Sequence, residues 1–283
     1  MKVIPKIEYM NLQRLVKKIL GVRGVSLAKS LSAYMAPERL SICINGKYFI
    51  VNPKRNYVFW KLVQMGKWES STYTVLDKFL DKRHSCIDIG SWVGPTVLYA
   101  SQLAKHCYAV EPDPAAFSEL RNNIQLNKEL ISKITLSNLA LGNSSGTIYL
   151  HQTDGEWGSS GSNILFDKTK ASIQVKSITI QQFIQTNSIT DCNFIKMDIE
   201  GGEFIVLPTM LEYLRTIKPT ILLELHPMFI DNPVQKLKDM QNVLDIYDHI
   251  YDERLEKINL ESIMFSFKNN SNKTLRIVLT SVS

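Results

Sequence analysis

The sequence has few cysteines, and nothing in their spacing predicts a metal site or a disulfide framework. Cys43, Cys86, Cys107 and Cys192 lie far apart, without Cys-x-x-Cys spacing or a matching histidine cluster. Two of them fall in expected core strands, where a free thiol behaves as a small hydrophobic side chain. This cysteine usage predicts a reducing compartment.

Long apolar runs and dense basic runs are also absent. Nowhere do eighteen apolar residues run together, and residues 1–6 lack the apolar segment of a signal peptide, so we expect a cytoplasmic protein. Thirty-three Lys and Arg against twenty-seven Asp and Glu leave a formal charge of +6. This mild excess predicts no nucleic-acid partner, while an anionic substrate or peripheral membrane contact stays open.

A dinucleotide-binding fingerprint, Gly-x-Gly-x-x-Gly, is missing as well, although the chain contains the strand, turn and helix that would carry it. Residues 86–94 predict a buried strand that enters a glycine-rich turn, and Pro95 starts a helix pattern. The turn has the form Asp88-x-Gly90-x-x-x-Gly94. This spacing fits poorly around a pyrophosphate. It fits better around S-adenosylmethionine, whose amino group and sulfonium a carboxylate can face.

A second apolar run, residues 107–110, is followed by Glu111 and Pro112. Glu111 lies twenty-three positions after Asp88. An acid at the end of the second strand can accept both hydroxyls of a ribose. The two turns together predict a nucleotide cofactor. A third strand over residues 134–141 would place the adenine near Leu139.

The chain is long enough for one main core and an appendage. We expect the appendage at residues 1–80, with an amphipathic helix at 12–20, a tight hairpin over 40–51 and a helix pattern from Tyr73 to Leu80. The main domain then spans residues 81–283. Glu69 should lie near the mouth of the site, because its segment leads into the first core strand, and it is a candidate substrate contact.

An insertion at about residues 144–180 interrupts the strand–helix alternation of the main domain. Its segments 146–150 and 172–178 both alternate and can pair, and the polar loop 155–163 between them is either a solvated connection or a lid. If it is a lid, Trp157 and Ser160 are candidate substrate contacts.

Two later strands place further acidic and histidine side chains at the same edge of the sheet. The strand over 194–198 ends in Asp198, followed by Glu200, and the strand over 220–225 is followed by His226. A carboxylate or a histidine at such a position can remove a proton, and His226 is slightly favoured because its ordinary pKa is near neutrality. The same groups, with Glu224, leave a Mg²⁺ site open as a minority interpretation.

The end of the chain predicts a helix over 234–244 and two strands, 263–267 and 275–279, joined by a polar turn. An antiparallel hairpin of this kind would close the sheet.

These residues resemble the FkbM-type family of S-adenosylmethionine-dependent methyltransferases over roughly residues 57–230. The matching segments are Asp88-Ile89-Gly90 with Gly94, Glu111-Pro112 with Asn123 and Asn127, Ala140-Leu141-Gly142, and Lys196-Met197-Asp198-Ile199-Glu200-Gly201-Gly202-Glu203. Where many relatives carry Ala-Asn-Ile-Gly, this chain has Ser91-Trp92-Val93-Gly94. The Trp92 indole would contact the cofactor as a cation–π partner, or pack.

The resemblance implies a class I methyltransferase (Rossmann-like) fold, an α/β, doubly wound, mostly parallel seven-stranded sheet. It also implies O-methylation of a sugar, a surface glycan or a secondary metabolite, so that the partner is a small-molecule or glycan acceptor. Asp88, Gly90, Ser91, Trp92, Gly94, Glu111, Pro112, Leu139 and Asp198 would bind the cofactor, and His226, Asp198 and Glu200 are the catalytic candidates. Two alternatives stay open, namely a nicotinamide-dependent oxidoreductase and a catalytically silent binding module.

Overall fold

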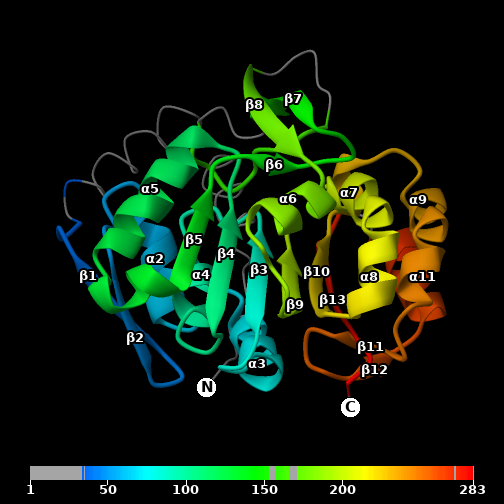
Figure 1. The fold of residues 1–283 in the computed structure, drawn as a ribbon, viewed down its shortest axis with the longest axis horizontal. Coiled ribbons are helices and arrows are strands. Elements are labelled where there is room, and N and C mark those ends of the chain that lie inside the picture. The colour runs from blue at the N-terminus through cyan, green and yellow to red at the C-terminus, as the bar shows by residue number, and fades with distance from the viewer. Residues whose placement is uncertain (1–33, 35, 153–156, 166–170, 271, 283) are drawn as a thin grey trace.

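The computed structural model describes residues 34, 36–152, 157–165, 171–270 and 272–282. Its largest element is a mixed sheet of eight strands. They are β3 (Ser85–Ile89), β4 (His106–Val110), β5 (Ile134–Ser137), β9 (Cys192–Met197), β10 (Thr220–Leu225), β11 (His249–Asp252), β12 (Lys257–Ile258) and β13 (Leu275–Thr280). Their order is β12-β11-β13-β10-β9-β3-β4-β5 (Figure 1).

This topology confirms the predicted doubly wound, mostly parallel fold. The chain leaves the central strand β3 toward β4 and β5, then returns to its other side as β9 and β10, and all five strands are parallel. The strand β13 runs antiparallel to both β10 and β11. The sheet has eight strands where seven were predicted, because the two-residue strand β12 pairs with β11 at the edge.

Hydrophobic side chains cover both faces of the sheet because successive residues of a strand point to opposite faces. In β10, Ile221 and Leu223 belong to one buried cluster and Leu222 to the other. The first cluster includes residues of α6 (Ile180–Thr186), α7 (Glu203–Thr209), α8 (Leu211–Ile217), α9 (Pro233–Asp239), α10 (Gln241–Leu244) and α11 (Leu260–Asn269). The second includes residues of α2 (Tyr57–Gln64), α3 (Ser70–Phe79), α4 (Pro95–Ala100) and α5 (Pro114–Gln125). Short 3-10 helices lie at Lys128–Lys133 and Pro227–Phe229.

The N-terminal hairpin is confirmed and packs on this second face. The strands β1 (Leu40–Ile44) and β2 (Lys47–Val51) pair across Asn45 and Gly46, which both have positive φ as a tight turn requires. The Asn123 and Asn127 side chains of the α5 region bond the backbone of Asn52 and Ile50. Residues 40–80 therefore share a core with the sheet. The helix predicted at 12–20 lies outside the described residues.

The insertion also pairs as predicted. The strands β7 (Gly146–His151) and β8 (Ser172–Ile178) are antiparallel and form a separate three-stranded sheet with β6 (Ala140–Leu141). The single strand expected over 134–141 was wrong, because its first half belongs to the main sheet as β5 and its last two residues to the insertion as β6.

The closing hairpin was predicted with the wrong partner. Residues 263–267 lie in α11, which Asn259 caps by accepting a hydrogen bond from the backbone N–H of Ser262. Ile263 and Phe267 are buried four positions apart, whereas Phe265 between them is 67% exposed. A strand would place all three on one face. The strand that pairs with β13 is instead β11.

The cysteines are all unpaired thiols, and three of the four are buried. Cys86 and Cys107 are register partners in β3 and β4, where they contribute to the second cluster. No helix among the described residues is long and apolar enough to cross a membrane.

Candidate active site

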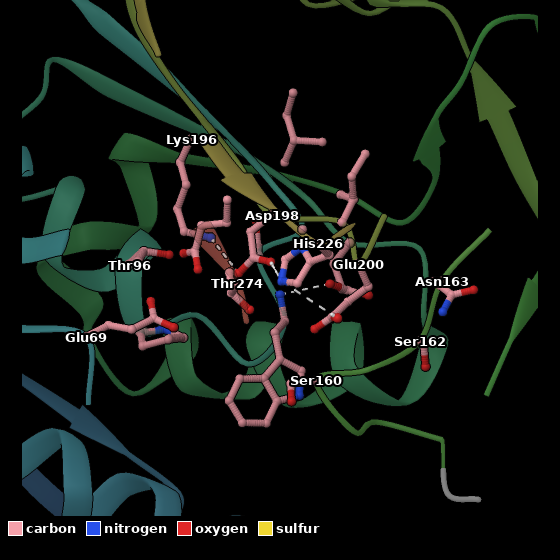
Figure 2. A pocket seen from close by; sticks show the side chains of 18 of the residues that line it. Glu69, Thr96, Ser160, Ser162, Asn163, Lys196, Asp198, Glu200, His226 and Thr274 are labelled. Carbon is pink, nitrogen blue, oxygen red and sulfur yellow. Dashed lines mark hydrogen bonds and ion pairs between the residues drawn. The ribbon is translucent and has the colours of Figure 1, made fainter. Parts of the chain in front are cut away.

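A cavity of about 500 Å³ opens where β3, β4, β9 and β10 end. This volume suits a small-molecule site, and the carboxyl edge of a parallel sheet is where such sites form. Figure 2 shows Asp198, Glu200 and His226 gathered at one place, with Glu69 and Lys196 on one side of them and Ser162 and Asn163 on the other.

The turn after β3 contains a glycine that a larger residue cannot replace. Gly90 has φ +84°, and a Cβ there would lie 1.8 Å from the Asp198 backbone oxygen. Gly90 therefore lets the ends of β3 and β9 meet. Gly94 has another role, because its Cβ would lie 2.5 Å from Leu120 Cδ1 of α5. Gly90 and Ser91 line the cavity, whereas Gly94 does not.

Asp88 lies beneath the cavity rather than on its wall. Its side chain is buried, Oδ2 accepts a hydrogen bond from the Thr96 hydroxyl, and Oδ1 has no hydrogen-bond partner. Burial raises its pKa, although Lys196 opposes this shift. Asp88 thus contacts the wall of the cavity through Thr96, which lines it.

Glu111 lines the other end of the cavity with a fixed carboxylate. Oε2 accepts the Trp92 N–H at 2.8 Å, and Oε1 accepts the Asp113 N–H at 2.8 Å. Burial raises its pKa to about 8, even though both backbone N–H groups favour the ionised form. Each oxygen keeps capacity for one more donor, which is the requirement for binding a pair of ribose hydroxyls.

The insertion loop is anchored over this end by Asp113 and Trp92. Asp113 Oδ1 caps α5, while Oδ2 accepts the Gly158 N–H at 2.7 Å and the Ser162 hydroxyl at 3.1 Å. The Trp92 indole N–H donates to the Gly158 carbonyl at 2.9 Å. The indole packs edge-on against the Phe59 ring, with 4.3 Å between the ring centroids, and Trp92 also lines the cavity. These contacts favour a lid over a solvated connection.

The turn after β9 is organised by Glu203. Its Oε1 accepts the Ile199 N–H at 2.8 Å, and its Oε2 accepts the Gly201 N–H at 2.9 Å. The turn places Glu200 in the left-handed region at φ +54°. Such a conformation is strained for a residue with a side chain, and it is a common feature of functional sites.

His226 is surrounded by carboxylates. Its Nδ1 lies 3.1 Å from Glu203 Oε1, and its Nε2 lies 3.7 Å from Asp198 Oδ1 and 3.8 Å from Glu200 Oε2. Although burial alone would lower its pKa, Glu200, Glu203 and Asp198 raise the pKa of His226 well above its ordinary value. These carboxylates favour the protonated form of the imidazole, which argues against the favoured prediction of His226 as general base.

The pKa values of the two neighbouring carboxyl groups, Glu200 and Asp198, are shifted in opposite directions. Burial raises the pKa of Glu200 to about 8, against the attraction of His226. The Asp198 pKa is lowered despite burial, chiefly by Lys196, whose Nζ lies 3.2 Å from Asp198 Oδ2. Groups with opposed shifts in one cavity are typical of active sites.

Arg276 closes the site and was not predicted. From β13 it donates to Glu224 Oε2 and Glu69 Oε1, each at 2.7 Å, and lies 3.4 Å from Glu253 Oε2. The anticipated position of Glu69 at the mouth of the site agrees with this contact, since Glu69 lines the cavity. An arginine in the apolar strand sequence 275–279 was the signal that could have revealed it.

The cavity brings together most of the predicted site residues. Those that line it are Glu69, Gly90, Ser91, Trp92, Glu111, Pro112, Ser160, Asp198, Glu200 and His226. Asp88, Gly94, Leu139 and Trp157 do not line it. The Trp157 side chain packs on the small cluster of the insertion, and its backbone oxygen accepts a hydrogen bond from Arg55. Sequence reasoning overlooked Asp113 as an anchor, although an aspartate directly before Pro114 is a pattern typical of a helix cap.

Comparison with known proteins gives one family match. The family model for the methyltransferase FkbM domain matches residues 88–251, more than half of the chain. No curated protein matches the chain.

Several solved structures are distantly similar to this chain. The methyltransferase FkbM of Methylobacillus flagellatus KT is 16% identical with a TM-score of 0.45, over 70% of this chain and 44% of that one. This chain thus spans less than half of that protein's length. A Streptococcus mutans protein described as a methyltransferase and solved with SAH is 14% identical (TM-score 0.39, 75% and 96% covered). The precorrin-6y C5,15-methyltransferase of Geobacter metallireducens GS-15 is 12% identical (TM-score 0.41, 76% and 87% covered).

Proposed function

This chain belongs to the FkbM methyltransferase family, and from that premise we propose that it methylates a hydroxyl of a sugar, a surface glycan or a secondary metabolite, with S-adenosylmethionine as donor. The observation that carries the proposal is a single cavity lined by both Glu111 and the group Asp198, Glu200 and His226. Transfer to a hydroxyl needs a nucleotide-binding carboxylate at one end and groups that take a proton at the other.

The cavity suits a cationic donor. Four buried carboxylate oxygens around it accept no hydrogen bond, namely Glu69 Oε2, Asp88 Oδ1, Glu200 Oε2 and Glu224 Oε1. Buried carboxylate oxygens without a hydrogen-bond donor are costly, so they favour a ligand with positive charge and N–H donors. When bound, S-adenosylmethionine supplies a methyl group on a sulfonium. Glu111 would hold its ribose, and Glu69 and Asp88 would attract its amino group.

Proton removal from the acceptor hydroxyl falls to the cluster at the ends of β9 and β10. Of the three catalytic candidates, Glu200 has the buried oxygen without a hydrogen-bond partner, so we assign Oε2 of the ionised carboxylate, which forms as pH approaches its raised pKa of about 8, as the proton acceptor. His226 and Lys196 would hold the neighbouring charges in place. A positioned base of this kind contributes about 100- to 10,000-fold to the rate, and alignment of the reactants supplies the larger share.

The open end of the cavity favours an acceptor with negative charge. Lys67, Arg254 and Lys273 are exposed and line the same cavity. Exposed basic side chains at a cavity mouth attract anionic ligands from solution. A phosphorylated or carboxylated sugar fits this charge better than a neutral metabolite.

The test is calorimetric titration with S-adenosylhomocysteine beside NAD, followed by a turnover assay on candidate glycans that detects the added methyl by mass. We expect binding of S-adenosylhomocysteine and none of NAD. Glu200→Gln should retain that binding and lose at least about 100-fold in turnover. The matched control is Glu256→Gln, an exposed glutamate that does not line the cavity, which should behave as wild type. Binding of NAD alone would favour the oxidoreductase alternative, and binding of neither would refute the proposal.

A further inference from the structure

We propose that Asp198, Glu200 and His226 form a binding site for one divalent metal ion, of the class exemplified by Mn²⁺. Three candidate ligand atoms, Asp198 Oδ1, Glu200 Oε2 and His226 Nε2, all lie within 4.8 Å of one another. They come from the ends of two neighbouring strands, β9 and β10, and Figure 2 shows them pointing toward one another.

The separations fit an ion better than direct contact. His226 Nε2 lies 3.7 Å from Asp198 Oδ1 and 3.8 Å from Glu200 Oε2, which is too far for hydrogen bonds. Two metal–ligand bonds of about 2.1 Å span at most about 4.2 Å. An ion can therefore bridge His226 to either carboxylate, with at most a small inward rotation to close the third edge.

Glu203 gives His226 the orientation of a metal ligand. With Nδ1 3.1 Å from Glu203 Oε1, the ring directs Nε2 to the other two carboxylates. Glu203 is fully buried and is itself fixed by the Ile199 and Gly201 N–H groups. Histidines that bind metals commonly donate their second ring N–H to a carboxylate in this way.

Glu200 provides an independent observation that points to a ligand. It is 94% buried, its Oε2 accepts no hydrogen bond, and its backbone is held at φ +54°. A strained backbone that carries a buried carboxylate oxygen without a hydrogen-bond donor into a cavity costs free energy twice. A cation at Oε2 would recover the second of these costs.

The charges and donor types identify the class of ion. Lys196 contacts Oδ2 of Asp198 and leaves Oδ1 on the side of His226. Two carboxylate oxygens and one imidazole nitrogen, with remaining positions for water or a hydroxyl, suit Mn²⁺ or Fe²⁺ better than Ca²⁺ or a thiolate-seeking ion.

Because Glu200 Oε2 would bind the ion, the ion would replace that oxygen in activating the acceptor. A hydroxyl bound to the ion has a lower pKa, so it loses its proton more readily near neutral pH. This use rests on the proposed function, whereas metal binding does not. The two can therefore fail separately.

The experiment is titration of the chelator-treated full chain with Mn²⁺, with the free ion measured by electron paramagnetic resonance. We expect one ion per chain. Glu200→Gln and His226→Gln should weaken binding at least 10-fold, and Glu203→Gln by about 10- to 100-fold as a positioning residue. The matched control Glu253→Gln, in the same cavity but outside the three ligands, should stay within about twofold. Circular dichroism verifies that each variant is folded.

Two results would overturn the site. One is no saturable binding of Mn²⁺, Mg²⁺ or Zn²⁺ by the wild type up to millimolar concentration. The other is a folded Glu200→Gln chain that binds Mn²⁺ as well as the wild type. S-adenosylhomocysteine binding measured on the same metal-free sample separates the hypotheses, because its presence without Mn²⁺ binding leaves the proposed function intact. Its absence beside specific Mn²⁺ binding would leave only the metal site.

Discussion

Cofactor binding should be linked to the protonation of Glu111. This carboxyl has a pKa of about 8 because it is buried, and both of its oxygens already accept backbone N–H groups. Ribose hydroxyls that donate to it favour the ionised form. Binding must therefore release the proton that Glu111 carries at neutral pH, and affinity should rise with pH.

The expected size follows from the pKa. A carboxyl with a pKa of about 8 is about one-tenth ionised at pH 7 and about nine-tenths ionised at pH 9. Affinity should rise about tenfold between these values, or about 1.4 kcal/mol, with close to one proton released per ligand at pH 7. Adenosine is the probe of choice, because it has the ribose hydroxyls without the titrating amino group of the cofactor. The number of protons released on binding is obtained by calorimetry in two buffers that differ in their heat of ionisation.

Glu111→Gln is the matched variant. It cannot ionise, so its weaker binding should not vary with pH. Its amide also places an N–H₂ group against one backbone N–H, which should lower stability by about 1–3 kcal/mol. In the wild type without ligand, the folded state keeps the Glu111 proton longer than the unfolded state. The contribution of Glu111 to stability should thus fall as pH rises from about 4.5 to 8. A wild-type affinity that is flat or falls from pH 7 to 9 would refute this reasoning.

Three further substitutions test the framework of the site. Gly90→Ala drives a Cβ into the Asp198 backbone oxygen and should abolish binding of S-adenosylhomocysteine in calorimetry, with near-normal affinity counting against the close approach. Asp113→Asn keeps the cap of α5 but opposes the Gly158 N–H with an amide N–H₂, so we expect about tenfold weaker binding and faster amide exchange at 158–162; unchanged exchange would contradict the anchor. Arg276→Leu leaves buried carboxylates unpaired and should cost about 3–5 kcal/mol in urea unfolding, whereas a loss below 1 kcal/mol would contradict that pairing.

Local patterns predicted the strand ends that carry the chemistry, because each depends on neighbouring residues. A buried strand followed by glycine and an acid has few alternatives, and the Asn45-Gly46 pair has one common use. The same local logic failed at residues 263–267. There the apolar residues Ile263, Phe265 and Phe267 alternate as in a strand, while the helix is set by the Asn259 cap and by burial of only two of them. Which of these side chains is buried depends on the face of the helix that the rest of the chain covers, and residues 263–267 alone do not contain this information.

The remaining features of the site depend on contacts between distant parts of the chain. Glu69 and Arg276 are separated by 207 positions, and Asp113 and Gly158 by 45. Neither pair has a spacing rule, because loop closure of such lengths leaves no sequence pattern. The shift of residues 140 and 141 into a second sheet is of the same kind, since it requires β8 as a partner. Local patterns predicted the reactive groups, but the contacts between them follow only from the fold.

The position of β13 in the sheet determines when the sheet can be completed during synthesis of the chain. A ribosome makes the chain from its N-terminus, yet the strand between β10 and β11 is the last of the sheet to be synthesised. Until residues 275–280 emerge, β10 presents an open edge of six residues that are all buried in the finished fold. Such an edge readily pairs with other chains. A premature stop codon before Leu275 should therefore yield an aggregating product rather than a folded chain of lower stability. A nascent chain forms the ion pairs of Arg276 with Glu69 and Glu224 only after translation has passed this point.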